Sequence, residues 1–590
     1  MSRAGGNSPV ATSTPAPQEP RSGADANDLG PGPLSGRVRP VEWALLAVAL
    51  IVSLALRFHA LGTPGLWVDE AYTVNVSLRP LGELLAQLQA DDAPPFYYLL
   101  QSGMLRIFGT SEFSVRLLSA IASSLTTVVL WAWARRLGAA GIVAILWSAT
   151  SIAVFYAQQA RSYALLHLGV ALLLWLGTRI WESPRPERRD SVAFLLVALG
   201  LLYAHNLAVW TLLAAFAWIA PRYRSDRRTG LLLLGAFSLG AVPWVTATVS
   251  QLGVHAELNE WMGKWWETHS LWLGPLYSLG VFANGTAAWV RPPTPFASLP
   301  SAYTLAAYVV WAMVASGIVL AAITTVRPRL RAGALGPWLL LAAPFAGLVL
   351  TTLVIGPAYV VGRTDTFALV PFVGLLGWGF SRHRIGWGLT LFWMAIGAWL
   401  VWTPTSNPKA TDRDLATWIG SEVENGDAVV VSALGRPTLE HYATRDGWRA
   451  RLGDLRAYPA VLDENPAAVF PTPVDSVAAY ESEARALRAR WEATGTRNVW
   501  ILTLLLGTEH AGFPAGGALP MPPPAARATL TANDLPYPMS VLVYSLRGLE
   551  PVDVLREYRQ DWVGGDRVVL RIPTREFISP DSLKPIGAGS

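Results

Sequence analysis

Mostly apolar runs of about 20 residues recur between positions 41 and 402, and they restrict the fold more than any other feature of the sequence. Such a run matches the thickness of a bilayer, where the backbone must satisfy its hydrogen bonds within helices or closed barrels. Only 15% of the 590 residues are charged, against about 25% in soluble proteins. We therefore predict a polytopic α-helical membrane protein. About eleven transmembrane helices are expected, at 41–60, 114–134, 139–156, 163–181, 191–204, 206–220, 231–250, 302–326, 335–355, 365–380 and 386–402.

The connections between these runs alternate in character. One set is rich in arginine, as in RIWESPRPERRD and PRYRSDRRTG, and the positive-inside rule places it in the cytoplasm. Residues 1–38, rich in Gly, Pro, Ser and Ala, are predicted to be a disordered tail on the same side. Successive connections alternate between the two sides of the membrane without interruption if the segment 95–109, which begins with proline, lies along the outer surface and does not cross. The remaining connections then lie outside. The segments 191–204 and 206–220 could instead form one long helix.

Charge and cysteine content exclude several function classes. Cysteine is absent, which rules out disulfides, thiol nucleophiles and Cys-ligated metals. The net charge of +5 comes almost entirely from arginine, and it fits membrane orientation and no nucleic-acid partner.

The composition changes after residue 403. Short runs rich in β-branched residues alternate there with helical patterns such as SVAAYESEARALRARWEA. The expected strands lie at 427–434, 498–505, 539–546 and 567–572. We therefore predict three parts: the tail at 1–38, a transmembrane domain at 39–403 and a soluble extracytoplasmic α/β domain at 404–590.

Ionisable residues gather in the connections assigned to the outer side. Asp69 and Glu70 follow the first helix in GLWVDEAYTV, and two further carboxylates precede a Pro-Pro pair in QADDAPPFYYLL. Because the chain is poor in charge, ionisable groups at the membrane boundary are functional candidates. The candidates of this kind are Asp69, Glu70, Asp91, Asp92, Arg161, His205 and Arg363.

Each candidate also has a purely structural interpretation. The aspartates before Pro-Pro could cap the next helix. Arg161 could be an arginine that extends to the interface, and His205 a packing histidine. Arg363 could pair with nearby Asp365. Five tyrosines could belong to an interfacial belt: Tyr72, Tyr97, Tyr98, Tyr163 and Tyr359.

Carboxylates and guanidinium groups at one face of a membrane suit a particular chemistry. A carboxylate can take the proton of an acceptor hydroxyl. Arginines can hold a phosphate through charge-assisted hydrogen bonds and stabilise it as it leaves. A substrate with a surface phosphate and a long apolar chain is a polyprenyl-phosphate sugar.

At the level of motifs, residues 40–400 resemble the GT-C membrane glycosyltransferases. The motifs are GLWVDEAYT, DDAPPFYYLL, RLLSAIASSLTTVVLWAWARRLG, YAQQARSYALL, LLYAHN and GRTDTFALVPF, in this order. The resemblance is to bacterial family-39-like proteins, which are related to protein O-mannosyltransferases and to the lipid A aminoarabinose transferase. It implies a multi-pass enzyme of the bacterial cytoplasmic membrane whose site faces outward.

The resemblance implies an inverting transfer of a hexose or pentose from a polyprenyl-monophosphate donor to a hydroxyl of an envelope glycan, lipid or protein. One of Asp69 and Glu70 is then the general base, and we assign Asp69. The implied substrate-binding residues are Asp91, Asp92, Tyr72, Gln158, Arg161, Tyr163, His205, Tyr359 and Arg363.

Two questions stay open at this stage. Ala93 stands where many relatives have a histidine before Pro-Pro, which favours catalysis without a metal, although the four carboxylates could hold a divalent cation. A glycolipid flippase, a membrane-anchored sensor that works through the outer domain, and a ligase using a polyprenyl-diphosphate donor are the alternative functions.

Overall fold

The computed structural model describes most of the chain. The described residues are 38–91, 93–258, 260–285, 301–325, 333–402, 412–432, 435–459, 477–504, 529–532, 535, 539–559 and 566–579. All described residues belong to one unit, Val38–Ser590.

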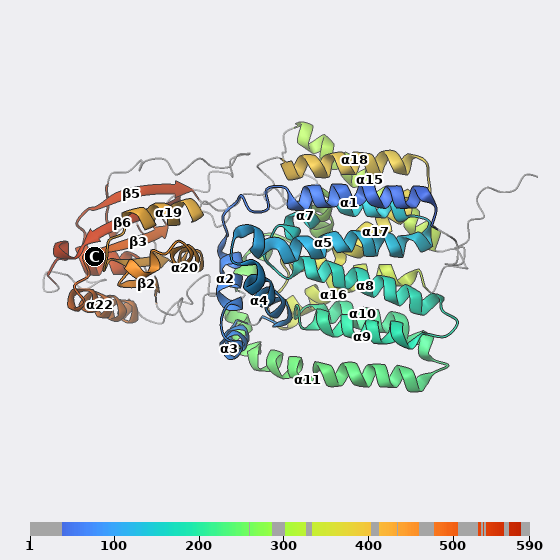
Figure 1. Ribbon diagram of the computed structural model, residues 1–590, viewed down its shortest axis with the longest axis horizontal. Coiled ribbons are helices and arrows are strands. Elements are labelled where there is room, and N and C mark those ends of the chain that lie inside the picture. Colours follow the sequence, from blue (N-terminus) through green and yellow to red (C-terminus); the bar gives the residue numbers. More distant parts are fainter. Residues whose placement is uncertain are drawn as a thin grey trace, which may run out of the picture. The chain divides into compact units, whose positions relative to one another are not determined.

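A bundle of long apolar helices forms the first part of this unit (Figure 1). Its helices are α1 (Pro40–Phe58), α5 (Glu112–Ala134), α6 (Ala140–Ala149), α7 (Ser151–Ala157), α8 (Tyr163–Glu182), α9 (Arg188–Leu202), α10 (Ala208–Ile219), α11 (Arg227–Leu258), α15 (Ser301–Thr325), α16 (Leu335–Val354), α17 (Leu369–Phe380) and α18 (Ile385–Trp402). All eleven predicted segments are helical, and the segments at 191–220 form two helices. Among the described residues, five helices are long and apolar enough to cross a membrane, or six if α6 and α7 form one bent span.

The predicted helix at 139–156 is broken, which corrects the expectation of one continuous span. α6 and α7 meet at 60°. Arg57 of α1 donates to the carbonyl oxygens of Trp147 and Ser148 at 3.2 and 2.8 Å, where α6 ends. The arginine thereby adds hydrogen-bond donors for carbonyl groups at the end of α6, where the break interrupts the regular helical pattern.

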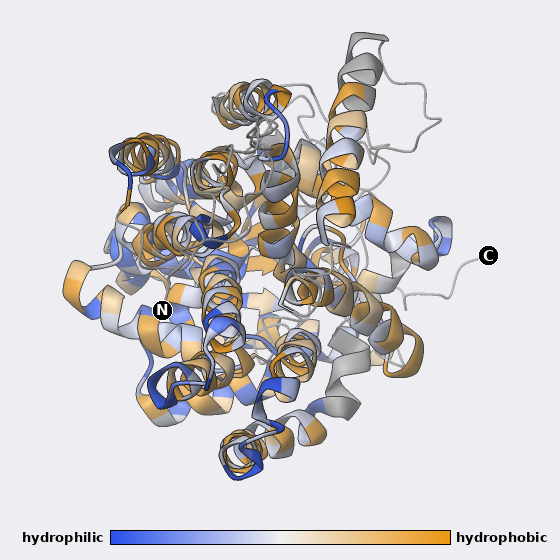
Figure 2. Ribbon diagram, turned by 90° about the vertical axis from the view of Figure 1, so that its right-hand side faces the viewer, coloured by the Kyte–Doolittle hydropathy of each residue, from blue (hydrophilic) through white to orange (hydrophobic). Residues whose placement is uncertain are grey.

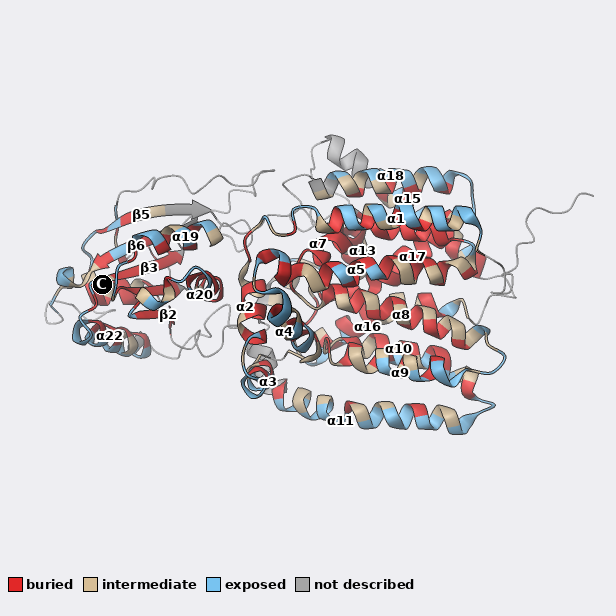
Figure 3. Cartoon of the chain, in the orientation of Figure 1, coloured by how far each residue is buried: buried red, intermediate tan, exposed pale blue. Residues whose placement is uncertain are grey.

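The outward sides of the helices are apolar, as a lipid-facing surface requires. Figure 2 shows the helices end on, with hydrophobic residues on their outer sides. α11 is the clearest case, because only 11% of its apolar stretch within Arg227–Gln251 is buried and Leu239 is 74% exposed. In Figure 3 it is mostly exposed or intermediate, whereas α5, α8 and α17 are largely buried. An exposed apolar helix of this length is stable in lipid and unfavourable in water.

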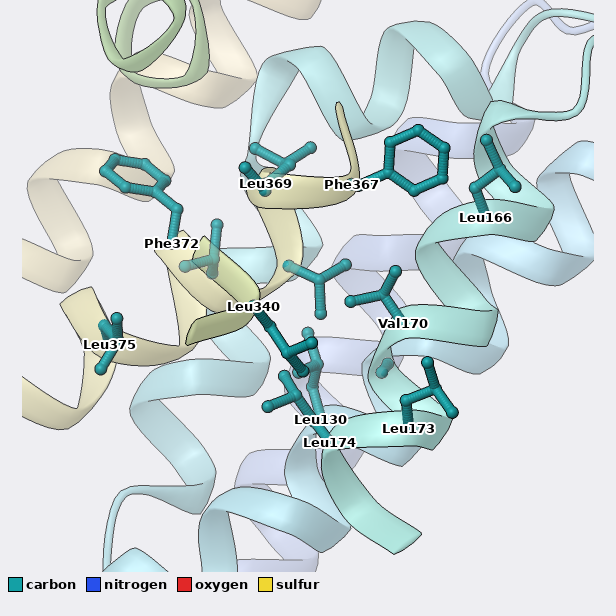
Figure 4. Packing of buried hydrophobic residues seen from close by; sticks show 14 of the residues in the cluster. Leu130, Leu166, Val170, Leu173, Leu174, Leu340, Phe367, Leu369, Phe372 and Leu375 are labelled. Carbon is teal, nitrogen blue, oxygen red and sulfur yellow. The ribbon is translucent and has the colours of Figure 1, made fainter. Parts of the chain in front are cut away.

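The core of the bundle lies between α5, α8, α16 and α17. Figure 4 shows Leu130, Val170 and Leu340 among the packed side chains. These residues belong to one cluster of buried apolar side chains. Glycines allow close helix contacts here, since a Cβ on Gly379 would lie 1.9 Å from the carbonyl oxygen of Gly317. The core fixes the ends of these helices, and the site lies at one of those ends.

Short helices cover the end of the bundle where α1 finishes and α8 begins (Figure 1). They are α2 (Val68–Ser77), α3 (Leu81–Ala90) and α4 (Phe96–Phe108). A later connection forms α12 (Glu260–Thr268) and α13 (Gly274–Asn284). α4 falls within the segment 95–109 that is predicted to lie along the surface. α2 begins with two acidic residues, which favour a helix N-terminus through the backbone dipole.

The C-terminal α/β region, residues 412–579, contains a six-stranded mixed sheet in the order β2-β1-β3-β6-β5-β4. Its strands are β1 (Ala428–Ser432), β2 (Asp454–Tyr458), β3 (Asn498–Leu504), β4 (Thr529–Leu530), β5 (Val552–Arg559) and β6 (Asp566–Pro573). β1 pairs in parallel with β2 and β3, and the other pairs are antiparallel. Its longer helices are α19 (Asp412–Glu422), α20 (Arg436–Arg445), α22 (Val477–Ala493) and α23 (Met539–Arg547).

Three of the four predicted strands, at 427–434, 498–505 and 567–572, coincide with β1, β3 and β6. The prediction of a strand at 539–546 is wrong, because this segment is helix α23. Its buried residues Met539, Leu542, Val543 and Leu546 follow helical spacing. A short apolar run fits both structures until its partners are known.

Candidate active site

Asp69 lies between two guanidinium groups. Arg363 donates from Nη2 to Oδ2 of Asp69 at 2.8 Å, and Nε of Arg161 lies 3.8 Å from the same oxygen. The three side chains are 22–27% exposed, so they are held in the protein and still open to a ligand. Residues from α2, from the loop before α8 and from the loop before α17 therefore form one charged group.

Two tyrosines hold the arginines in place. The hydroxyl of Tyr163 accepts from Nε of Arg363 at 2.8 Å, and the hydroxyl of Tyr98 accepts from Nη1 of Arg161 at 3.4 Å. Burial lowers the pKa of Arg363, but Tyr163 and Asp69 raise it more, so its pKa lies above the ordinary value. Both arginines are fixed cations that point toward Asp69.

Asp91 adds a second carboxylate close to this group. It follows α3 and lies near the Tyr72 hydroxyl and near the charges of Arg161 and Asp69. Burial raises the pKa of Asp91 to about 6, while Tyr72 and Arg161 act in the opposite direction. The neighbouring Asp92 lies outside the described residues.

His205 lies beside the arginines as a neutral ring. Its pKa falls to about 3 because of burial and the charges of Arg161 and Arg363. The N–H of Leu207 donates to Nδ1 at 3.2 Å, which assigns the ring proton to Nε2. The ring also packs against Tyr163 and Phe367, at centroid distances of 6.3 and 5.3 Å. His205 is therefore suited to donating a hydrogen bond and unsuited to accepting a proton near neutral pH.

Glu70, the second residue of the acidic pair, faces the interior. It is 1% exposed and receives two hydrogen bonds from Arg116, at 2.8 and 2.7 Å. The N–H of Ala160 donates to its Oε1 at 3.1 Å. Arg116 also donates to the carbonyl oxygens of Leu61, Pro64 and Gly65. Glu70 and Arg116 thus fold the chain that leads into α2.

Two other predicted binding residues also lie in the supporting structure. Gln158 donates to the carbonyl oxygens of Leu56 and His59 at 3.0 Å, at the end of α1. Tyr359 is 1% exposed, and its hydroxyl forms a 2.7 Å hydrogen bond with Ser278. Ser278 in turn donates to Asp365.

Asp365 supports the loop of Arg363 without pairing with that arginine. Its Oδ2 accepts from the N–H of Gly362 at 2.9 Å, and burial raises its pKa to about 7. The structure therefore answers the alternative left open by the sequence. Arg363 pairs with Asp69 across 294 residues, whereas Asp365 shapes the turn that presents Arg363.

Residues 92–247 match the family model described as dolichyl-phosphate-mannose-protein mannosyltransferase. This segment contains Arg116, Gln158, Arg161, Tyr163 and His205. No curated protein matches the chain in sequence.

The fold is similar to that of solved GT-C structures. The apo structure of ArnT from Cupriavidus metallidurans has a TM-score of 0.50 and 15% identity over 91% of this chain and 99% of that chain. ArnT bound to undecaprenyl phosphate gives 0.49 and 14%, over 90% and 98%. The mycobacterial arabinofuranosyltransferase AftD gives 0.40 and 17%, over 78% of this chain and 36% of that chain.

The fold is therefore similar to that of the GT-C membrane glycosyltransferases, and residues 92–247 match a glycosyltransferase family model. Both findings support the resemblance stated from the motifs. The assignment of individual site residues stays a prediction.

Sequence reasoning missed several residues that build the site. Arg57 and Arg116 are fully buried, and each lies within a predicted membrane run. A charge at such a position requires a partner, which was the available signal. The sequence suggests only a belt role for Tyr98, yet its hydroxyl accepts a hydrogen bond from Arg161.

Metal ligands are not evident among the described residues. No group of three or more His, Asp or Glu side chains is close enough there to hold a metal ion. Asp69 and Asp91 are the described carboxylates of the site, and their neighbours are arginines and tyrosines.

Proposed function

We propose that this protein is an inverting glycosyltransferase that moves a sugar from a polyprenyl-monophosphate donor to an acceptor hydroxyl at the outer face of the membrane. The observation that carries the proposal is the Asp69 carboxylate between Arg363 and Arg161. The matched family model is named for a dolichyl-phosphate-mannose donor, which is a sugar on a polyprenyl monophosphate.

In this mechanism, Asp69 accepts the proton of the acceptor hydroxyl. The acceptor oxygen attacks the anomeric carbon from the side opposite the phosphate. A C–O bond forms to the acceptor while the bond between the anomeric carbon and the phosphate oxygen breaks. The bonding electrons stay with the polyprenyl phosphate as it leaves.

The arginines take part through the charge that develops on the phosphate. Arg363 donates to Asp69 and Arg161 lies 3.8 Å from it, and a donor phosphate would compete for the same guanidinium groups. Hydrogen bonds from the arginines to the phosphate would leave the Asp69 carboxylate free to contact the acceptor hydroxyl. His205 donates from Nε2 to the sugar or the phosphate, and Asp91 orients the sugar.

The test is release of polyprenyl phosphate by the purified protein in nanodiscs. A panel of polyprenyl-monophosphate sugars is offered with a crude envelope acceptor, to the wild type, Asp69→Asn and Arg363→Ala. We expect one donor to be consumed and both variants to lose this activity while remaining folded.

The matched control is Asp190→Asn. Asp190 accepts from Arg179 at 2.9 Å, in an ion pair similar to that of Asp69. Sixteen residues of α8 separate Arg179 from Tyr163, which is about 24 Å along a helix. Asp190→Asn is expected to retain activity. Normal release by Asp69→Asn would refute the role of Asp69, and consumption of a diphosphate-linked donor alone would favour a ligase.

A further inference from the structure

Helix α20 of the C-terminal α/β region packs directly on α2, the helix that carries Asp69. The two helices belong to one cluster of buried apolar residues, in which Leu66, Ala71 and Val74 meet Leu439 and Ala443. Asn75 of α2 also donates to the carbonyl oxygen of Pro437 at 3.1 Å. The C-terminal region therefore contacts the scaffold of the site.

The most direct link runs through the hydroxyl of Tyr442. The N–H of Leu66, three residues before Asp69, donates to this oxygen at 2.6 Å. Tyr442 and Leu66 are both 0% exposed, so the bond is shielded from water. A backbone N–H in such a place has no alternative partner, and losing this one is costly.

The same hydroxyl connects to the start of α5. Tyr442 donates to Oε1 of Glu112 at 3.2 Å, and Arg445 donates to that oxygen at 2.9 Å. Arg413 lies 3.5 Å away from it. One tyrosine therefore joins the turn before α2, the first residue of α5 and two arginines of the C-terminal region.

The turn before Asp69 is thus held from two sides. Arg116, which is paired with Glu70, binds it within the membrane part by donating to the carbonyl oxygens of Leu61, Pro64 and Gly65. Tyr442 binds it from the C-terminal region at Leu66. Small displacements of a reacting group cost rate steeply, so this second contact bears on the reaction.

We propose that Tyr442 is a positioning residue for Asp69, so that the C-terminal region forms part of the catalytic unit. The inference rests on the proposed function, since it assumes that Asp69 is the base. The Tyr442 hydroxyl fixes the N-terminal turn of α2 and with it the direction of the Asp69 carboxylate toward the acceptor.

The experiment compares Tyr442→Phe with Tyr458→Phe. Tyr458 is 1% exposed and donates to the carbonyl oxygen of Tyr480 at 2.9 Å, so its variant loses a similar buried hydroxyl that does not touch α2. We expect Tyr442→Phe to lower kcat about tenfold, since misplacement by about 1 Å can cost up to 100-fold. The KM for the donor should stay unchanged, because Arg363 and Arg161 keep their places.

A second measurement does not depend on activity. Hydrogen exchange of the amides of residues 66–71 should become faster in Tyr442→Phe and stay at the wild-type rate in Tyr458→Phe. Faster exchange with a lowered kcat supports the proposal. Wild-type kcat in Tyr442→Phe, or an equal fall in Tyr458→Phe, overturns it.

The outcome for Asp69→Asn separates this inference from the proposed function. If Asp69→Asn abolishes transfer while Tyr442→Phe behaves like Tyr458→Phe, only the positioning role is wrong. If Asp69→Asn retains transfer, both are wrong. Should Tyr442→Phe fail to fold, Asn75→Ala removes a hydrogen bond between α2 itself and α20. It is judged by the same exchange and kcat criteria, with about a threefold fall in kcat expected.

Discussion

The two faces of α2 differ more than their sequence suggests. Asp69 is partly exposed and has two arginines on a single oxygen, at 2.8 and 3.8 Å. Glu70, the next residue, is buried in a two-bond pair with Arg116 and accepts a further backbone N–H. Because successive residues of a helix point about 100° apart, one carboxylate is open to a ligand and the other is built into the scaffold. An acidic pair in a motif can therefore contain one partly exposed carboxylate and one that is buried in the scaffold.

The largest expected effect is on the rate of sugar transfer, when Asp69 on the open face of α2 is replaced. Asp69→Asn should lower transfer by about 10²–10⁴-fold, the usual contribution of a general base. Its thermal midpoint should stay close to that of the wild type, because the ion pairs of Asp69 are partly exposed and therefore weak. Initial rates of polyprenyl-phosphate release and a thermal scan in the same detergent check both statements. A fall in midpoint that accounts for the lost rate would remove the contrast between the two faces.

The buried face should show the reverse pattern. Glu70→Gln leaves Arg116 as an unpaired buried cation, which typically costs about 3–5 kcal/mol. We expect a lower thermal midpoint and lower yield, with the rate per folded molecule close to that of the wild type. The double variant Glu70→Leu with Arg116→Met should recover much of the midpoint, since replacing both charges removes the unpaired cation. A rate loss in well-folded Glu70→Gln as large as that in Asp69→Asn would make Glu70 a catalytic candidate again.

The sequence predicts the positions of the helices better than it predicts which side chains contact each other. All eleven apolar segments are helical. They can be predicted because the length and hydrophobicity of a segment are local properties of the sequence. Position by position, the motif locates Asp69 and Arg363, but their 2.8 Å contact spans 294 residues and appears only in the fold. Arg116, the partner of Glu70, lies 46 residues away, within the predicted membrane helix at 114–134.

The C-terminal region shows the same limit in another form. The strands β1, β3 and β6 are visible as β-branched runs, whereas the apolar run that forms α23 fits a strand equally well. Tyr442 carries no signal in the sequence at all, because its hydroxyl bonds a backbone N–H 376 residues earlier. Contacts of this kind depend on how two parts of the chain pack, which no local pattern encodes.

A smaller effect on activity is expected when the positive charge beside Asp69 is kept but the guanidinium group is replaced by an ammonium group. Arg363→Lys retains the charge and loses the planar group that bonds Tyr163 and Asp69 together. We expect kcat/KM for the donor to fall by about 10–100-fold, between the wild type and Arg363→Ala. Steady-state kinetics over a range of donor concentrations measure this fall, and Arg179→Lys in the distant pair with Asp190 serves as the control. Equal activity of Arg363→Lys and the wild type would mean that charge alone suffices.

The smallest effect concerns Asp91, which combines features of both faces. It is partly buried and lies near Arg161, and burial raises its pKa to about 6 from about 3.9 in an unfolded chain. Because the folded value is the higher one, its protonated form stabilises the fold below about pH 4, and this stabilisation is lost as the pH rises through about 6. Asp91→Asn should therefore raise the thermal midpoint by a few degrees at pH 7.5 and leave it unchanged at pH 4.

Activity should depend on the opposite form of Asp91. If the ionised carboxylate orients the sugar, kcat/KM of the wild type falls as the pH drops through about 6, and this limb is absent from a lower, flat profile in Asp91→Asn. Profiles from pH 4.5 to 8 in nanodiscs test this, with Asp190→Asn as the control for a carboxylate outside the site. A variant that gains stability at pH 7.5 without losing the acidic limb would place Asp91 with Glu70, in the scaffold, because its burial would then serve the fold without serving the reaction.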